Sequence, residues 1–226
     1  MKSLALKISM AVLSMIPLVA KAELTVLASP QSNDAYYAKM IDDIFDFHVD
    51  YAKKIIKNGD NVVVLTDKGL YPDYVKALGK KHVAIAPMHD IWMRDFTSAN
   101  PAQPVMFRYT AAGQGGAKKG QAISDEVQDE FKYYSQKAGL QFTQSKLLND
   151  GGNWVEDGYG NVVLSTKFLA DNKLTESEAR KKLMALTGAK QIAFIEADEQ
   201  GGLEHADGVV RFFDKNTLVI NSYPAD

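Results

Sequence analysis

Three short stretches of the sequence gather side chains that could carry out chemistry. Residues 89–95 read His-Asp-Ile-Trp-Met-Arg-Asp and hold two carboxylates, an imidazole, an indole and a guanidinium. A second stretch, Asp-Gly-Gly-Asn-Trp, begins at Asp150, and a third, His-Ala-Asp, begins at His205. Loops at strand ends carry functional side chains on a rigid scaffold, so we expect the three stretches to meet at one site.

Three carboxylates in these stretches, those of Asp90, Asp95 and Asp207, suit a guanidinium ligand. A carboxylate accepts two parallel hydrogen bonds from a planar guanidinium, and an indole face such as that of Trp92 attracts the same cation. Burying several acids together requires a cation that neutralises them. That cation is either an arginine-like ligand or Arg94, which could instead close a turn by pairing with Asp90 and Asp95.

His205 could supply general acid and base catalysis, because an imidazole titrates near neutral pH. It stands two residues before Asp207, so both side chains point to the same face of an extended chain. The alternative is a surface histidine in the polar, glycine-rich segment that begins at Gln200. The Gly-Gly pair of the second stretch permits a sharp turn or a close backbone approach.

Histidine and aspartate side chains also bind divalent metals, and such a site would use His89, Asp90, His205 and Asp207. These residues lack a paired spacing such as His-x-x-x-His, which would support a metal site. We therefore predict no metal and no cofactor.

Composition predicts one soluble globular domain. The 226 residues are 46% hydrophobic and 24% charged, which is ordinary for a globular protein. The formal net charge of −2 provides no basic field for nucleic acid or for anionic lipid. The sequence has no cysteine, so it offers no disulfide, no thiol nucleophile and no thiolate metal ligand.

The amino terminus has the pattern of a secretory signal peptide. Lys2 and Lys7 accompany an apolar segment, residues 8–20, that is too short to span a bilayer. A small-x-small cleavage pattern follows, so we expect removal of residues 1–22 and a mature chain that begins at Glu23, periplasmic or secreted. An uncleaved anchor is the alternative, and after cleavage we expect no membrane association.

Strands alternate with helices along the rest of the chain, which indicates an α/β fold. Apolar steps of three and four residues predict the helices, and β-branched runs predict the strands. The predicted strands are residues 24–27, 61–66, 82–86, 104–109, 141–148, 154–156, 162–165, 191–196, 209–213 and 217–221, and the predicted helices are residues 37–56, 71–78, 124–138 and 175–186. We also expect a surface loop at residues 111–120, a packing role for His48, and a capping box formed by Thr175 and Glu178. A ββαβ-type unit recurs about three times in this order.

Taken in this order, the three stretches resemble the agmatine deiminase and bacterial peptidyl-arginine deiminase family, and the resemblance covers residues 24–223. The family has the pentein fold, a five-bladed α/β propeller of ββαβ units, and about three of the five units would be present in residues 23–226. The resemblance implies hydrolysis of a guanidino group to a ureido group with release of ammonia. The partner would then be a small guanidino compound or an arginyl peptide.

The resemblance also implies roles for single residues. Asp95 and Asp207 would hold the two sides of the guanidinium, and His205 would protonate the leaving ammonia and later activate water. Trp92 would line the pocket. Substrate binding would further involve residues of the first two stretches, namely Asp90, Asp150 and Asn153.

The sequence departs from the family's patterns in ways that leave the substrate open. Asp150 stands where the family usually has the longer glutamate. Agmatine deiminases continue after the second aspartate of the first stretch with x-Gly-Pro, whereas Asp95 is followed by Phe96 and Thr97. Peptidyl-arginine members hold a C-terminal carboxylate with arginines in a loop that corresponds to residues 110–116, which contain none.

The largest departure concerns the nucleophile. Members of the family attack the guanidinium carbon with a cysteine near the C-terminus and form an amidino-thioester that water hydrolyses. Without a cysteine we expect this chain to be inactive by itself, as a truncated gene product or a fragment, with a natural short pseudoenzyme as the alternative. A different function also stays open, that of a non-catalytic periplasmic binder of arginine or a polyamine-like cation.

Overall fold

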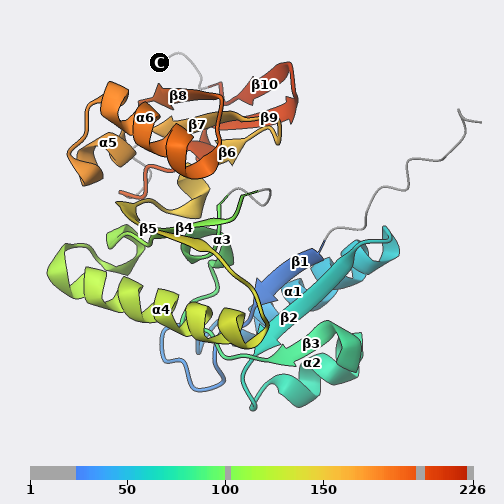
Figure 1. Cartoon of the computed structure of the whole chain (residues 1–226). Helices are drawn as coiled ribbons and strands as arrows, with labels where there is room; N and C mark the ends of the chain where they lie inside the picture. Colours follow the sequence, from blue (N-terminus) through green and yellow to red (C-terminus); the bar gives the residue numbers. More distant parts are fainter. Residues whose placement is uncertain (1–23, 100–102, 197–201, 223–226) are drawn as a thin grey trace, which may run out of the picture.

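The first tier of the structure is a parallel three-stranded sheet made by two successive βαβ units. Its strands β1 (Leu24–Ala28), β2 (Asn61–Thr66) and β3 (Val83–Ile85) lie in the order β1-β2-β3. Helices α1 (Ile41–Lys57) and α2 (Tyr71–Leu78) make the crossovers, as parallel pairing requires. This computed structural model describes residues 24–99, 103–196 and 202–222 (Figure 1), so the predicted signal peptide and cleavage site lie outside the described residues.

The second tier contains one βαβ unit. Strands β4 (Val105–Arg108) and β5 (Thr143–Leu148) pair in parallel, and the long helix α4 (Ala117–Lys137) connects them. An isolated antiparallel bridge joins Ala99 to Val105 at the start of β4. No helix in the described part of the chain is long and apolar enough to cross a membrane.

The third tier follows a ββαβ order. Strand β6 (Val155–Glu156) is antiparallel to β7 (Asn161–Ser165), and β7 pairs in parallel with β8 (Gln191–Ile195). Helices α5 (Lys167–Asn172) and α6 (Glu176–Thr187) lie between β7 and β8 in the sequence. The three tiers are visible as separate groups of ribbons in Figure 1.

A hairpin and several short turns of helix complete the described fold. The hairpin pairs β9 (Val210–Asp214) with β10 (Thr217–Ile220) and contacts β6. The short helical turns are α3 (Met93–Phe96), η1 (Lys80–His82), η2 (Ala112–Gln114), η3 (Gly151–Asn153) and η4 (Ala206–Gly208). Three of them, α3, η3 and η4, contain or adjoin the three stretches that the sequence singles out.

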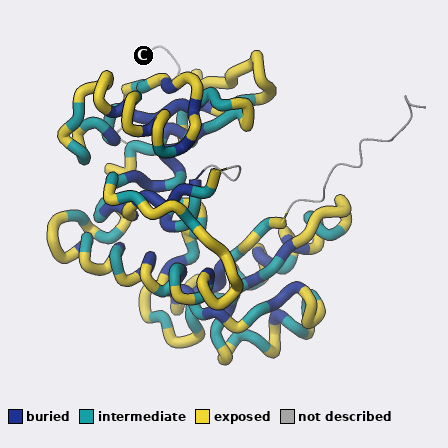
Figure 2. The backbone as a smooth tube through the Cα atoms, in the orientation of Figure 1, coloured by how far each residue is buried: buried dark blue, intermediate teal, exposed yellow. Residues whose placement is uncertain are grey.

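Buried apolar side chains join the tiers to one another. One cluster holds Phe107 of β4 together with Trp154, Leu164 of β7 and Leu183 of α6. Another contains residues of the first two tiers, namely Ala28, Ala86, Met88, Phe96, Met106, Tyr109, Val127 and Phe131. Buried positions are concentrated in strands such as β4 and β7, whereas β5 and β10 contain none, and exposed positions mark the outer turns (Figure 2). Burial of each large side chain contributes roughly 1.5–3 kcal/mol, so these clusters fix the backbone that carries the short turns.

Most predicted elements are present, and their differences from the structure have physical causes. The capping box of Thr175 and Glu178 is formed, and His48 is buried against Tyr74, as expected. The predicted loop at residues 111–120 is wrong from residue 117 onward, because α4 begins there. Gly120 lets this first turn lie against the backbone, since a Cβ atom there would stand 2.7 Å from the Gln114 carbonyl oxygen.

The recurring ββαβ unit is only partly present. The third tier follows it, and the second approaches it through the bridge between Ala99 and Val105. The first tier differs, because its three strands are all parallel and are joined by two helices. The structure is thus a mixed α/β fold, and the propeller arrangement with three of five units stays a prediction.

Candidate functional site

The first and third stretches line one cavity of about 620 Å³, and the second stretch contacts its Asp95 and His205 from outside the lining. We call it the acidic cavity, and it is lined by Asp34, Tyr36, Tyr37, His89, Asp90, Trp92, Arg94, Asp95, Tyr109, Gly113, Gln114, Leu203, His205 and Asp207. The volume lies in the range that binds small molecules. Asp95, Asp207, His205 and Trp92 all face it, so the predicted convergence is present.

The functional side chains are held in place by sequence neighbours that are buried in the core. Phe96, next to Asp95, has no exposed surface and packs in the core between the first two tiers. Ala206, between His205 and Asp207, is also fully buried. Because these anchors are embedded in the core, the polar side chains beside them have little freedom to move. This local pattern of a buried residue beside an acid explains why loops can hold a defined geometry here.

Close backbone packing brings α3 and η3 together. The Gly152 amide donates a hydrogen bond of 2.9 Å to Oδ1 of Asp95. A Cβ atom at Gly151 would collide with the Arg94 carbonyl oxygen, and one at Gly152 would collide with the His205 ring. The Gly-Gly pair is therefore required by close approach, as its sequence pattern indicates.

His205 lies between two carboxylates. Its Nε2 atom is 3.1 Å from Oδ2 of Asp150, and its Nδ1 atom is 3.8 Å from Oδ1 of Asp95. Its side chain is only 13% exposed, which rules out the alternative of a surface histidine. An imidazole held in this way can exchange a proton on the Asp95 side while the Asp150 side fixes its orientation.

Burial and charge move the proton affinities of these groups toward neutrality. Burial is the main cause that raises the pKa of Asp95 to about 6, the charge of His205 opposes it, and the other carboxylates add to it. Burial alone would lower the pKa of His205, but its hydrogen bond to Asp150 and the charges of Asp95, Asp150 and Asp207 raise it instead. Perturbed pKa values of neighbouring acids and bases are frequent at functional sites.

Asp207 has arginines as its charged neighbours. The Arg94 Nε atom and the Arg211 Nη2 atom each lie 3.6 Å from Oδ2 of Asp207. Arg94 also donates a hydrogen bond of 2.9 Å to the Trp154 carbonyl. Among the described residues it forms no ion pair with Asp90 or Asp95, so the alternative of a turn closed by these three residues is wrong. Its side chain reaches across to η4 because both of those acids are held by other donors.

Asp90 is buried, and both oxygens of its carboxylate accept hydrogen bonds from the protein. Its Oδ1 atom accepts hydrogen bonds from the Tyr37 hydroxyl and the Ile91 amide, and its Oδ2 atom accepts one from Gln114 at 2.8 Å. Burial, together with the charge of Asp90, raises the pKa of Tyr37. These contacts show Asp90 as a brace for the cavity wall. Trp92, by contrast, is 61% exposed, with its indole available at the rim.

Asp150 and Asn153 lie beneath the cavity, although sequence reasoning placed them in contact with substrate. The Asn153 Oδ1 atom accepts hydrogen bonds from the Ser165 and Ala206 amides, which connects η3 to β7 and η4. Asp150 is 2% exposed and contacts His205 and Thr110. Their contacts in the structure are with the protein itself.

Sequence reasoning missed several residues of the cavity wall: Asp34, Tyr36, Tyr37, Tyr109 and Gln114. No motif marks them, and Tyr37 and Tyr109 stand at the ends of a predicted helix and a predicted strand, whereas the structure places both in the adjoining connections. The tyrosines offered a weak signal, since aromatic residues with a polar tip are frequent where a pocket meets water.

Comparison with known proteins supports the same assignment. The sequence model described as Porphyromonas-type peptidyl-arginine deiminase matches residues 14–226, which is almost the whole chain. The chain belongs to this family. The family assignment made from the three stretches is thereby confirmed.

Solved structures of agmatine deiminases share the fold of this family member. The structure of C. jejuni agmatine deiminase is 21% identical with a TM-score of 0.68, over 87% of this chain and 60% of that one. Enterococcus faecalis agmatine deiminase is 16% identical with a TM-score of 0.66, over 88% of this chain and 57% of that one. The chain thus spans about 60% of the length of these proteins, and at such identities the likeness concerns the fold alone.

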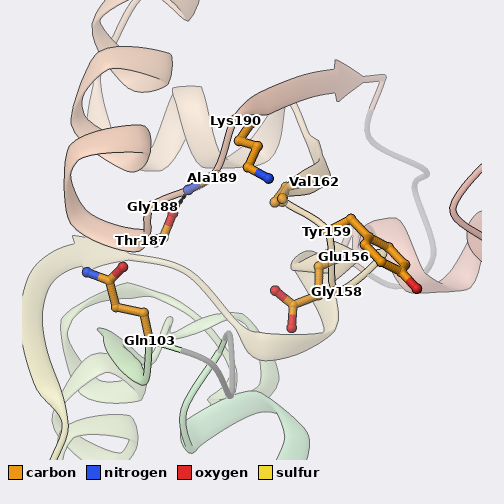
Figure 3. A pocket seen from close by; sticks show the side chains of 10 residues that line it. Gln103, Glu156, Gly158, Tyr159, Val162, Thr187, Gly188, Ala189 and Lys190 are labelled. Carbon is orange, nitrogen blue, oxygen red and sulfur yellow. Dashed lines mark hydrogen bonds between the residues drawn. The ribbon is translucent and has the colours of Figure 1, made fainter. Parts of the chain in front are cut away.

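A second cavity of about 440 Å³ has no residue of the three stretches in its lining, although the Trp154 indole of the second stretch donates a hydrogen bond of 3.0 Å to Glu156 in its wall (Figure 3). Glu156 and Tyr159 line one side of it, and Gln103 lies opposite. It contains none of the residues predicted for the site. Within the described ranges no group of three or more histidines and acids is arranged to hold a metal, and His89 instead lies 3.6 Å from Glu130.

Proposed function

We propose that the acidic cavity binds the guanidino group of a small cation or an arginyl residue, and that the chain belongs to a hydrolase that converts this group to a ureido group with release of ammonia. The observation that carries the proposal is the placement of Asp95, Asp207 and His205 on one cavity. Candidate substrates are agmatine, arginine and peptidyl-arginine.

The charges of the cavity favour a cationic substrate. Four of the lining residues are aspartates, namely Asp34, Asp90, Asp95 and Asp207. A guanidinium placed between Asp95 and Asp207 would receive hydrogen-bond acceptors on both sides and would replace part of the charge that Arg94 and Arg211 now provide to Asp207. The exposed indole of Trp92 could cover its face.

The chemical step would need a thiolate that this sequence does not contain. By family resemblance, a thiolate adds to the guanidinium carbon, and the carbon–nitrogen bond breaks as His205 gives a proton to the departing ammonia. Water, deprotonated by His205, then attacks the amidino-thioester carbon, and the thiolate leaves. We therefore expect the 226-residue chain alone to bind substrate and to release no ammonia.

A purely binding role is the second candidate, and the absence of a cysteine from the sequence favours it. In that case the same acids and Trp92 would hold arginine or a polyamine-like cation in the periplasm. We also propose that residues 1–22 direct export, that the mature chain begins at Glu23, and that its fold corresponds to about three of five propeller units.

Calorimetric titration of the purified chain tests the proposal. Agmatine, arginine and an arginyl dipeptide are the probes, with putrescine as the probe that keeps an amine but lacks a guanidino group. We expect binding of at least one guanidino probe, much weaker binding of it in Asp95→Asn, and no ammonia release. Equal affinity for putrescine would favour the polyamine binder, and no binding of any probe would sink both functions.

A further inference from the structure

Thr110 stands two residues after the end of β4 and contacts Asp150, the acid that holds the candidate catalytic histidine. We propose that Thr110 is a positioning residue for His205: through Asp150, its hydroxyl fixes the carboxylate and limits how strongly that carboxylate retains the His205 proton. The inference rests on the proposed function for its meaning in catalysis, but the contacts themselves do not depend on it. The sequence motifs give no sign of this role.

Two hydrogen bonds connect Thr110 to Asp150. The Thr110 amide donates to Oδ1 and the Thr110 hydroxyl donates to Oδ2, each at 2.8 Å. Both residues are buried, with 4% and 2% exposure. A carboxylate held at both oxygens by one residue cannot rotate freely, so Thr110 determines the direction in which Asp150 faces His205.

A second hydrogen bond, from Ala112, determines which way the Thr110 hydroxyl proton points. The Ala112 amide donates a hydrogen bond of 3.3 Å to the same oxygen, so this oxygen is an acceptor on that side. Its proton therefore points toward Asp150, as the donor arrangement requires. The backbone is held as well, because the Ser124 hydroxyl donates to the Thr110 carbonyl at 2.6 Å.

Thr110 and His205 share one oxygen of Asp150. The Oδ2 atom receives the Thr110 hydroxyl at 2.8 Å and lies 3.1 Å from Nε2 of His205. An ionised carboxylate only accepts, so Nε2 carries a proton and Nδ1 is the nitrogen left to exchange protons near Asp95. A donor on Oδ2 withdraws negative charge from it, which weakens its attraction for the imidazolium.

The other charged groups around His205 come from separate elements and are not touched by Thr110. They are Asp95 on α3 and Asp207 on η4, the latter near Arg94 and Arg211. A change at Thr110 would therefore act on His205 through Asp150 alone. This separation makes the effect measurable in the absence of any ligand.

The test compares the same substitution at two buried threonines. Thr110→Val removes the hydroxyl on Asp150, whereas Thr187→Val removes a hydroxyl that donates to the Leu183 carbonyl and accepts from the Ala189 amide in α6. Thr187 is 2% exposed, so the two sites are matched in burial, and each hydroxyl donates to an oxygen and accepts from the amide two residues later. Nuclear magnetic resonance titration of the ligand-free chain reads the His205 pKa, assigned among the four histidines with His205→Gln.

We expect the His205 pKa to rise by roughly 0.5–1 in Thr110→Val, because the carboxylate loses a donor. It should return toward its original value in Thr110→Ser and stay unchanged in Thr187→Val. An unchanged or lowered pKa in a folded Thr110→Val chain would overturn the proposal, as would failure of the serine variant to restore it. If Thr110→Val does not fold, Thr110→Ser, which keeps the hydroxyl, must fold and must match the original chain in the His205 pKa. If the unmodified chain binds no guanidino probe, the proposed function is refuted, but the His205 titration still tests the role of Thr110.

Discussion

The acidic cavity, of about 620 Å³, and the second cavity, of about 440 Å³, differ in how their charged side chains are held. In the acidic cavity, Asp95 accepts a hydrogen bond from a backbone amide and lies near a buried histidine. In the second cavity, Lys190 is exposed and has no carboxylate within 4.0 Å among the described residues. The hydroxyl of Thr187 in the second cavity accepts a hydrogen bond from the Ala189 backbone amide, drawn as a dashed line in Figure 3.

The positions of the two cavities in the fold explain this difference. Most residues of the acidic cavity follow the carboxyl ends of β1, β3 and β4, and the rest, in and just before the third stretch, precede β9. Its buried braces follow β4 and β5, so they stand on turns that are fixed by the core. In the second cavity, Gly160 and Lys190 stand directly before β7 and β8, at the amino ends of these two strands. In α/β sheets, ligands bind beyond the carboxyl ends of the strands. A cavity is thus a candidate site when its charges are buried and coupled, and volume alone does not decide it.

The largest contrast should appear in ligand binding. Asp95→Asn removes one charge from the predicted guanidinium clamp, so we expect the affinity for the bound guanidino probe to fall by about 2–5 kcal/mol, as for a charge pair that loses one partner. Glu156→Gln makes the same kind of change in the second cavity and should leave affinity unchanged. Calorimetric titration of both variants measures this, and equal losses would contradict the assignment of the acidic cavity.

Alanine substitution should lower the free energy of unfolding by different amounts at two glycines, one beside each cavity. Gly151→Ala places a Cβ atom against the Arg94 carbonyl oxygen, and we expect unfolding to become easier by about 3 kcal/mol. Gly158→Ala meets no atom within 4 Å, although Gly158 has a φ of 74°, so the expected loss is about 1 kcal/mol. Urea unfolding of both variants provides the comparison. Similar losses would mean that α3 and η3 are free to separate.

The acidity of Asp95 should make binding depend on pH. Its carboxyl has a pKa of about 6 in the folded, ligand-free chain, and a guanidinium requires the ionised form. Affinity should therefore fall as the pH is lowered through that value, by about tenfold for each pH unit well below it, because each binding event must then release a proton. The weak binding that remains in Asp95→Asn should lack this dependence. A profile that is flat from pH 5 to 8 in the unmodified chain would refute the role of Asp95.

The smallest effect is expected at Lys190. Its side chain is exposed and its stem lies beside Gly160, so Lys190→Ala should change the free energy of unfolding by less than about 0.5 kcal/mol. Binding of the guanidino probes should not change. Thermal unfolding and calorimetry test both statements. A clear loss of affinity would show that the second cavity contributes to the site and would remove the contrast on which these predictions rest.

Local patterns in the sequence determined the elements of this protein and its reactive residues. β-Branched runs predicted β2 almost residue by residue, and the box at Thr175 predicted the start of α6, because both depend on contacts within a few residues. The three stretches, taken together and in order, were sufficient to show the resemblance to the family, and that resemblance in turn implies guanidino chemistry. These features are local, and the sequence contains them directly.

Only the tertiary structure decided which groups face the cavity and which support it. Arg94 pairs with Asp207 across the fold, and Asp150 contacts Thr110 and His205 from below, over separations of 40 and 55 residues. Such contacts depend on how the tiers pack, and no periodicity or motif encodes them. The pKa of Asp95 follows for the same reason, because it arises from burial and from charges that separate turns bring together.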